Sequence, residues 1–230
     1  MNTRIAAGMA MCMAIGLGLA GCATAELPTG TSDGPTPQDA RRDGRLSIDA
    51  PAIVDAPPDA CVPGQRQLLT NASFDLTPVG NGWTQTPANA TIPIIAPPPT
   101  GVTAASAPNI AWMGGAPSAV DQLSQELVVP AGATGFTLTG KLQIATAEFG
   151  LSAFDTVVIT VQNSTGATVA TLKTFSNLDE NAAFAPFTLN SPMSFAGQTV
   201  RLNFKSSTDA SFNTNFFFDD LAVNVVAGCQ

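Results

Sequence analysis

The side chains that could carry out catalysis in this sequence are mainly carboxylates, because it contains no histidine and no tyrosine. A serine or cysteine nucleophile would lack its commonest general base, and no glycine-rich loop that could cradle a phosphate is visible. Glu126, Glu148 and Asp155 are the acids that could form a glycosidase-type pair. Acids on strand faces and in turns are more often solvated or hold loops. We therefore expect a protein that is not an enzyme.

Two tryptophans are the residues best suited to contact a sugar, since an exposed indole can stack on the apolar face of a pyranose ring. Trp83 lies next to the first predicted strand. Trp112 stands between Asn109 and Gly114-Gly115, a composition that predicts a loop. Both are candidate ligand-binding residues, and Trp112 is the stronger one. Packing in the core is the alternative for each.

The charge balance of the 230-residue chain argues against a polyanionic partner. It has 9 basic and 17 acidic residues, for a net charge of −8. We therefore expect no nucleic acid among its partners. The length suits one domain with appendages.

Residues 1–21 have the features of an export signal. Arg4 precedes an apolar run that is long enough for a signal peptide yet short for a membrane span. The run ends in Leu19–Cys22 (LAGC), which resembles the lipobox of bacterial lipoproteins. The resemblance implies cleavage before Cys22, acylation of its thiol, as by palmitate, and a protein anchored in the cell envelope. The residue after Cys22 is Ala23 and not aspartate. In this respect the sequence resembles lipoproteins that are sent to the outer membrane or cell surface. An ordinary secretory peptide that contains a cysteine is the alternative.

Residues 22–60 predict a disordered linker behind the acylated cysteine. They are rich in proline, aspartate and alanine and poor in bulky apolar side chains, so they cannot bury enough surface to offset the entropy of ordering. Such a chain stays extended and holds a domain away from the membrane. A cation-binding acidic tail is the alternative interpretation.

Two cysteines bracket the domain that we expect over residues 61–230. Cys12 leaves with the signal and Cys22 is acylated, so Cys61 and Cys229 are the candidate partners in the mature chain. An oxidising envelope permits a disulfide between them. Closing so long a loop stabilises the fold by about 4–5 kcal/mol. The pairing requires that the two ends of the domain lie side by side.

Alternation of apolar and polar residues is the dominant pattern between these cysteines. It is clearest in the segment FTLTGKLQI at 136–144, and Asn163–Gly166 predicts the turn of a hairpin. No stretch combines helical periodicity with caps. The pattern predicts an all-β, two-sheet antiparallel sandwich. The expected strands lie at about 66–70, 125–129, 135–146, 155–162, 168–175, 184–190, 198–206 and 214–226.

Several segments, taken in order, resemble galactose-binding-like jelly-roll domains over about residues 66–226. They begin with Leu69–Asp75 (LTNASFD) and Trp83, continue through Asp121–Gln125 (DQLSQ), and end with Phe216–Asp220 (FFFDD). Their order is similar to that of the accessory β-sandwich domains of secreted bacterial peptidases and glycosidases. The resemblance implies a jelly roll related to carbohydrate-binding modules, a fold that serves many tasks. A catalytic domain usually accompanies such domains and is not seen in this sequence.

The same resemblance implies a structural calcium ion where the first and last strands meet. Calcium takes six to eight oxygen ligands, so backbone carbonyls would have to complete the shell. Loop capping or solvation of these acids is the alternative. Asp209 and Glu148 are secondary candidates. The residues that match the family's ligands are Asn71, Ser73, Asp75, Asp219 and Asp220.

These observations predict a membrane-anchored surface lipoprotein whose domain binds a glycan or another envelope component without chemistry. The alternative is a structural or protein-interaction module that docks an envelope protein through a sheet face or loop edge. A solvent-exposed Trp112 beside polar groups in a concave face would favour a sugar, whereas a broad flat apolar patch would favour a protein. The sequence does not specify an oligomeric state.

Overall fold

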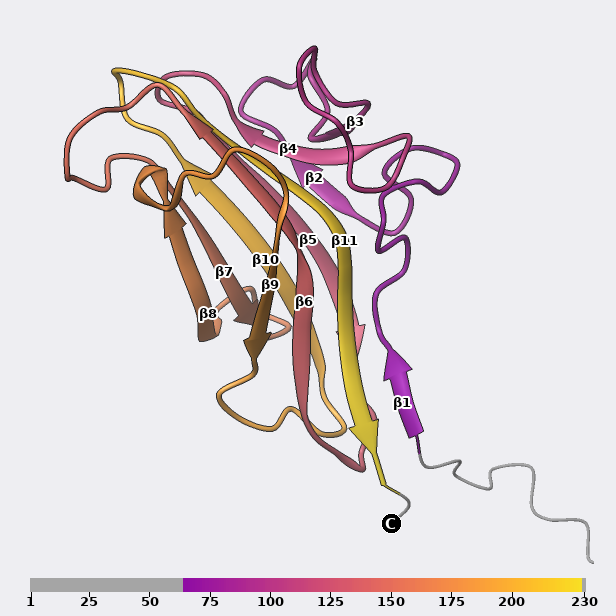
Figure 1. Cartoon of the computed structure of the whole chain (residues 1–230). Coiled ribbons are helices and arrows are strands. Elements are labelled where there is room, and N and C mark those ends of the chain that lie inside the picture. The colour runs from indigo at the N-terminus through magenta and orange to yellow at the C-terminus, as the bar shows by residue number, and fades with distance from the viewer. Residues whose placement is uncertain (1–63, 229–230) are drawn as a thin grey trace, which may run out of the picture. The chain divides into compact units, whose positions relative to one another are not determined.

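The computed structural model describes residues 64–228, which form two layers of antiparallel strands (Figure 1). Within this range the helical structure is limited to one 3-10 turn, η1 (Asn177–Asp179). The strands are β1 (Gly64–Gln67), β2 (Thr84–Thr86), β3 (Ile95–Ala96), β4 (Ile110–Gly114), β5 (Val120–Val128), β6 (Ala133–Thr146), β7 (Thr156–Gln162), β8 (Thr168–Ser176), β9 (Ala185–Asn190), β10 (Thr199–Ser207) and β11 (Thr214–Ala227).

Each layer is one sheet. The six-stranded sheet has the order β3-β4-β11-β6-β9, with β1 added to the end of β11, and the five-stranded sheet has the order β2-β5-β10-β7-β8. Every pairing is antiparallel. The predicted all-β, two-sheet jelly-roll sandwich is therefore confirmed.

The core lies between the sheets because alternate residues of the long strands are apolar. In β6, Phe136, Leu138, Leu142 and Ile144 point inward and are almost completely buried. Each fully buried side chain of this size stabilises the fold by about 1.5–3 kcal/mol relative to an exposed one. Gly140 continues the inward series without a side chain, because a Cβ there would lie 2.5 Å from Leu221 and 2.9 Å from Phe187.

The sequence predicted the long strands and missed the short ones. All eight expected strands are present, with shifted ends, and the turn at Asn163–Gly166 joins β7 to β8. Strands β2 and β3, of three and two residues, are too short to show alternation. The loop expected around Trp112 is wrong, because this residue lies in β4, which pairs with both β3 and β11.

The two ends of the described chain lie side by side, with Gly64 opposite Ala227 in the β1–β11 pair (Figure 1). This pairing meets the geometric condition for the expected disulfide. Cys61 and Cys229 lie outside the described residues, as do the signal at 1–21, Cys22 and the linker at 22–60. These expectations stay predictions.

Among residues 64–228, no helix is long and apolar enough to span a membrane.

Candidate functional sites

Trp112 is held in a fixed position on the outer side of the six-stranded sheet. Its neighbours Ala111 and Met113 point into the core, so the indole lies on the opposite face of β4. The ring packs against Phe217 at 5.9 Å between centroids. Its Nε1 donates a hydrogen bond of 2.9 Å to Asn215 Oδ1. The side chain is half-buried, so part of the indole stays accessible to a ligand.

A hollow of about 150 Å³ borders this indole. Its other walls are the segment 87–94 and the turn after β4, and they combine exposed Asn89 with exposed Ile92. Gly115 is essential to its shape. A Cβ there would lie 2.9 Å from Trp112 Nε1 and 2.8 Å from Asn215 Oδ1, and the backbone has φ +77°. Both conditions exclude a larger side chain while Trp112 keeps its position.

Asp121 ties together the walls of this hollow, which we call the Trp112 hollow. One carboxylate oxygen accepts a hydrogen bond from Ala88 N at 2.6 Å, and the other accepts from Gly114 N at 2.7 Å and from Ser206 Oγ at 3.3 Å. The carboxylate is buried. Sequence reasoning did not single out Asp121 as a site residue. One feature of the sequence indicates a special role for Asp121: it is an acid that shares the inward face of β5 with Leu123 and Leu127.

Trp83 lies in the core and is only 8% exposed. Its ring packs between Phe74, at 5.4 Å, and Phe204, at 6.3 Å, and its Nε1 donates to Asn71 O at 2.9 Å. Trp83 is therefore a core residue, as the alternative interpretation predicted. Of the two tryptophans, Trp112 alone is placed to contact a ligand.

A second hollow, of about 320 Å³, lies on the five-stranded sheet and is mostly polar. Glu126 lies here, 3.2 Å from Arg201 in an ion pair on the surface. None of the side chains that line it is aromatic. Glu148 and Asp155, the other two acids considered for a catalytic pair, do not line this hollow.

The first and last strand segments do meet, at a bulge in β11. Leu221 N donates to Ala72 O at 2.9 Å, and Asn71, Ser73 and Asp220 line one shallow hollow. Asn71 is occupied by bonds to the backbone: its side-chain oxygen accepts from Leu76 N and its amide donates to Asn81 O.

The three acids of this region also have protein partners. Asp75 accepts from Asn109 N at 2.9 Å. Asp219 is fully buried and accepts from Ser106 N, Ser106 Oγ and Asp220 N. Burial raises the pKa of Asp219, against the effect of these donors. Asp220 forms an ion pair with Lys141 at 2.7 Å, whose hydrogen bond lowers the pKa of Asp220. Each of these carboxylates has at least one protein partner, and none has a buried oxygen without a hydrogen bond. The calcium implied here by the resemblance stays a prediction.

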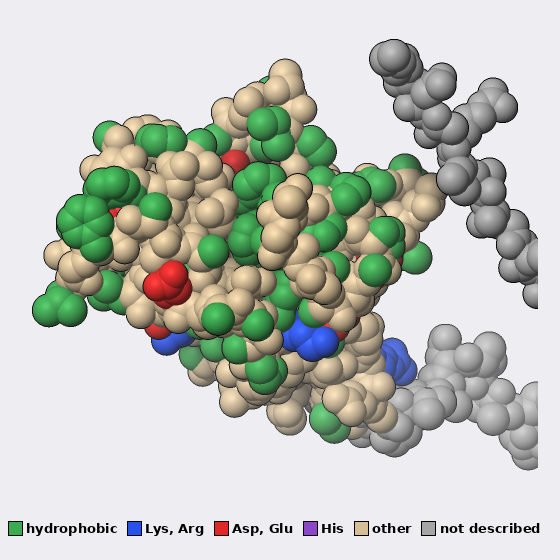
Figure 2. All heavy atoms as spheres, turned by 45° about the horizontal axis from the view of Figure 1, so that its top comes forward, with side chains coloured by type: hydrophobic (Ala, Val, Ile, Leu, Met, Phe, Trp, Pro, Cys, Tyr) green, Lys and Arg blue, Asp and Glu red, His purple; other side chains and the backbone are tan. Residues whose placement is uncertain are grey.

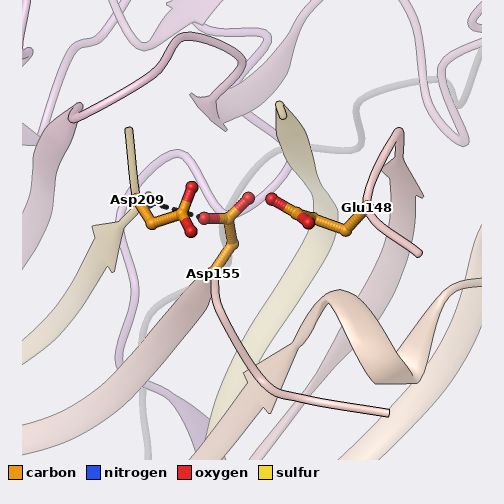
Figure 3. Close-up of side chains that lie close together, drawn as sticks. All are labelled: Glu148, Asp155 and Asp209. Atoms are coloured by element: carbon orange, nitrogen blue, oxygen red, sulfur yellow. Dashed lines mark hydrogen bonds between the residues drawn. The ribbon is translucent and has the colours of Figure 1, made fainter. Parts of the chain in front are cut away.

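A different group of acids converges at one end of the sandwich (Figure 3). Glu148 follows β6, Asp155 precedes β7 and Asp209 follows β10. Because β7 pairs with β10 and β6 pairs with β11, the loops 147–155 and 208–213 emerge together. One carboxylate oxygen from each acid lies within 4.8 Å of the other two.

This carboxylate cluster is only partly satisfied by hydrogen bonds. Asp155 is fully buried, and its Oδ1 accepts from Asp209 N at 2.7 Å. Asp155 Oδ2 and Glu148 Oε1 are buried and have no hydrogen-bond partner. Burial, followed by the charges of Asp209 and Asp155, raises the pKa of Glu148, against the effect of a hydrogen bond from the backbone of Phe212. Because Asp155 is inaccessible to a substrate, a glycosidase-type pair with Glu148 is not favoured.

Exposed apolar side chains lie on the same two loops as the cluster. Phe149 and Phe212 contact each other at 5.0 Å between centroids, and Phe149 is 73% exposed. Leu151 is 97% exposed and Phe154 is 46% exposed. Figure 2 shows hydrophobic side chains at the surface interspersed with polar groups and few charges.

Comparison with known proteins supports the fold. No known protein family matches the sequence, and no curated protein is similar to it. Among solved structures, TmCBM61 in complex with β-1,4-galactotriose is 14% identical, with a TM-score of 0.50, over 69% of this chain and 97% of that one. The expected similarity in fold to carbohydrate-binding modules is thus confirmed.

Two further solved structures are similar at lower scores. The CBM22-1 xylan-binding domain from Paenibacillus barcinonensis Xyn10C is 14% identical over 74% of this chain and all of that one, with a TM-score of 0.43. A cyclase from Fischerella sp. TAU is 15% identical over 73% of this chain and all of that one, with a TM-score of 0.48.

Proposed function

We propose that the domain is a non-catalytic glycan-binding module whose sugar contact is Trp112. The observation that carries this proposal is a half-buried indole, fixed by Asn215 and Phe217, that borders a hollow with both polar and apolar walls. A rigid aromatic surface beside a few polar groups is the arrangement that sugar recognition requires, because a pyranose ring has an apolar face and a polar edge.

The size of the Trp112 hollow limits the ligand. Its volume of about 150 Å³ is well below the roughly 300–1,000 Å³ of pockets for drug-sized ligands. One sugar ring fits such a space, and further rings of a longer glycan would lie along the open surface. We therefore expect weak binding of monosaccharides and tighter binding of oligosaccharides.

A glycan array with the full-length protein tests this function. The first probes are β-1,4-galactotriose, which TmCBM61 binds, and xylan. We expect Trp112→Ala to lower the affinity for the bound glycan at least about tenfold, a loss of 1.4 kcal/mol. Phe149→Ala is the matched control, since it removes an exposed aromatic ring away from the hollow. Failure to bind any glycan, or equal binding by Trp112→Ala, would contradict the proposal.

The module is further proposed to act on the outside of the cell, as a lipoprotein anchored through Cys22 with the linker 22–60 as spacer. The lipobox at Leu19–Cys22 supports this proposal. Two or more acyl chains hold a protein stably on a membrane, whereas one gives only marginal binding. Intact-mass analysis should find lipid on a chain that begins at Cys22, and Cys22→Ser should release the protein from the membrane fraction.

A protein-interaction module is the second candidate function, and the loops around the carboxylate cluster favour it. Phe149, Leu151, Phe154 and Phe212 present apolar groups to solvent at one end of the sandwich. Exposed apolar patches commonly mark protein contacts. Crosslinking in intact envelopes discriminates the two functions. Loss of a specific adduct in Leu151→Ser, together with a negative glycan array, would favour a protein partner.

A further inference from the structure

We propose that Glu148, Asp155 and Asp209 bind one divalent cation of the calcium type, which joins the loops 147–155 and 208–213. This proposal does not rest on the proposed glycan contact. Two of the three acids, Glu148 and Asp209, are the secondary calcium candidates of the family resemblance. The site differs from the main location that the resemblance implies, where Asp75, Asp219 and Asp220 already have protein partners.

The spacing of the three carboxylates suits calcium. Their ligand oxygens all lie within 4.8 Å of one another. Three oxygens separated by at most 4.8 Å can surround one point at a distance of no more than about 2.8 Å, close to the calcium–oxygen distance of about 2.3–2.6 Å. Acids from three separate chain segments thus need little or no movement to share a calcium ion.

Unsatisfied polar atoms give independent evidence at the same place. Among residues 64–228, the buried side-chain polar atoms without a hydrogen-bond partner are Asp155 Oδ2 and Glu148 Oε1. Asp155 has an exposed fraction of 0%, and its carboxylate points into the cluster in Figure 3. A buried, unpaired carboxylate oxygen is costly unless a cation or donor meets it. Both such atoms belong to this one cluster, which is what a missing shared ligand predicts.

The charge of the cluster points the same way. Three carboxylates lie close together, and the ion pairs of the described chain, Lys141–Asp220 and Arg201–Glu126, are elsewhere. No basic side chain therefore neutralises them within residues 64–228. A divalent cation would remove most of the repulsion. The chain has no histidine, and the ligands are all oxygens, so a hard cation is favoured over zinc or copper.

The surrounding loop holds Asp155 ready for this role. Asn177 Oδ1 accepts from Phe154 N at 2.9 Å and Asp155 N at 3.2 Å, and its Nδ2 donates to Ser152 O. Asp209 Oδ1 accepts from Ser211 N, which orients the Asp209 carboxylate. Backbone carbonyls and water would complete the six to eight ligands that calcium takes.

Calcium titration of the chelator-stripped, full-length protein tests the site. Calorimetry should detect calcium binding. The melting temperature should rise with calcium concentration, because the ion binds the folded state. Asp155→Asn should weaken this binding at least tenfold without lowering the melting temperature of the stripped protein, since it removes a buried unpaired charge. Glu148→Gln, at a more exposed position, should weaken binding as well.

Asp75→Asn is the matched control, because it alters an acid at the junction of the first and last strands. Calcium dependence should persist in this variant. Hydrogen exchange should slow at 147–155 and 208–213 when calcium is added to the native protein. Equal melting temperatures in millimolar calcium and in chelator would overturn the proposal. A calcium effect that is lost in Asp75→Asn and kept in Asp155→Asn would also overturn it.

Discussion

The two tryptophans occupy regions that differ in almost every respect except the residue itself. Trp83 is enclosed by Phe74 and Phe204 between the sheets, and its Nε1 is bonded to a backbone carbonyl. Trp112 is held on the outside of a sheet by one ring contact and one side-chain hydrogen bond, with a hollow beside it. A tryptophan is therefore a candidate ligand contact when the groups that fix it leave part of the ring exposed.

Loss of the indole should destabilise the fold far more at Trp83 than at Trp112. Trp83→Ala should lower the free energy of unfolding by about 3–5 kcal/mol, because it leaves a cavity among fully buried rings. Trp112→Ala should cost clearly less, since the side chain is only half-buried. Denaturant unfolding measures both. Equal losses would mean that Trp112 is a core residue and would break the comparison.

A smaller effect is expected at Gly115, which lies against Trp112. Gly115→Ala should lower the free energy of unfolding by about 1–3 kcal/mol through strain at positive φ, and it should weaken ligand binding by displacing the indole. Gly101→Ala is the control, because Gly101 also has positive φ, +91°, but has open space at its Cβ. Gly101→Ala should lower the free energy of unfolding through backbone strain alone and leave ligand binding unchanged. Loss of binding in both variants would show that Gly115 does not act through Trp112.

The smallest effect concerns the hydrogen bond that fixes Trp112. Asn215→Ala removes the acceptor of Nε1 and should cost about 0.5–1.5 kcal/mol in stability. Asn190→Ala breaks an exposed bond to Thr137 and serves as the control for a surface asparagine. Thermal unfolding and glycan binding should both change more in Asn215→Ala than in Asn190→Ala. The reverse order would show that the bond does not position the ring.

Much of the fold could be predicted from the sequence, because alternation within one strand is a local property. Strand β6 shows it over many residues, with apolar side chains at Phe136, Leu138 and Ile144. Strands β2, β3 and β4 are defined by their partners in the sheet, and residues of the same types could form a loop elsewhere. Asn109 and Gly114-Gly115 predict a loop around Trp112, yet these glycines end the strand.

The candidate sites could be predicted only in part, since they depend on which loops meet. Trp112 was recognised by its residue type. Asp121 could not be recognised in this way, because the donors of its three hydrogen bonds lie far along the chain or across the turn. Glu148, Asp155 and Asp209 lie on separate connections, and only the pairing of their strands brings them together.

Tryptophan fluorescence can report on Trp83 and Trp112 separately, because they are the only tryptophans in a chain without tyrosine. The variants Trp83→Phe and Trp112→Phe each retain one emitter and can be titrated with the glycan that the array identifies. We expect the glycan to change the emission of Trp112 in Trp83→Phe and to protect it from iodide quenching. The emission of Trp83 in Trp112→Phe should stay unchanged. Glycan binding by calorimetry without any change in the emission or quenching of Trp112 would contradict the account.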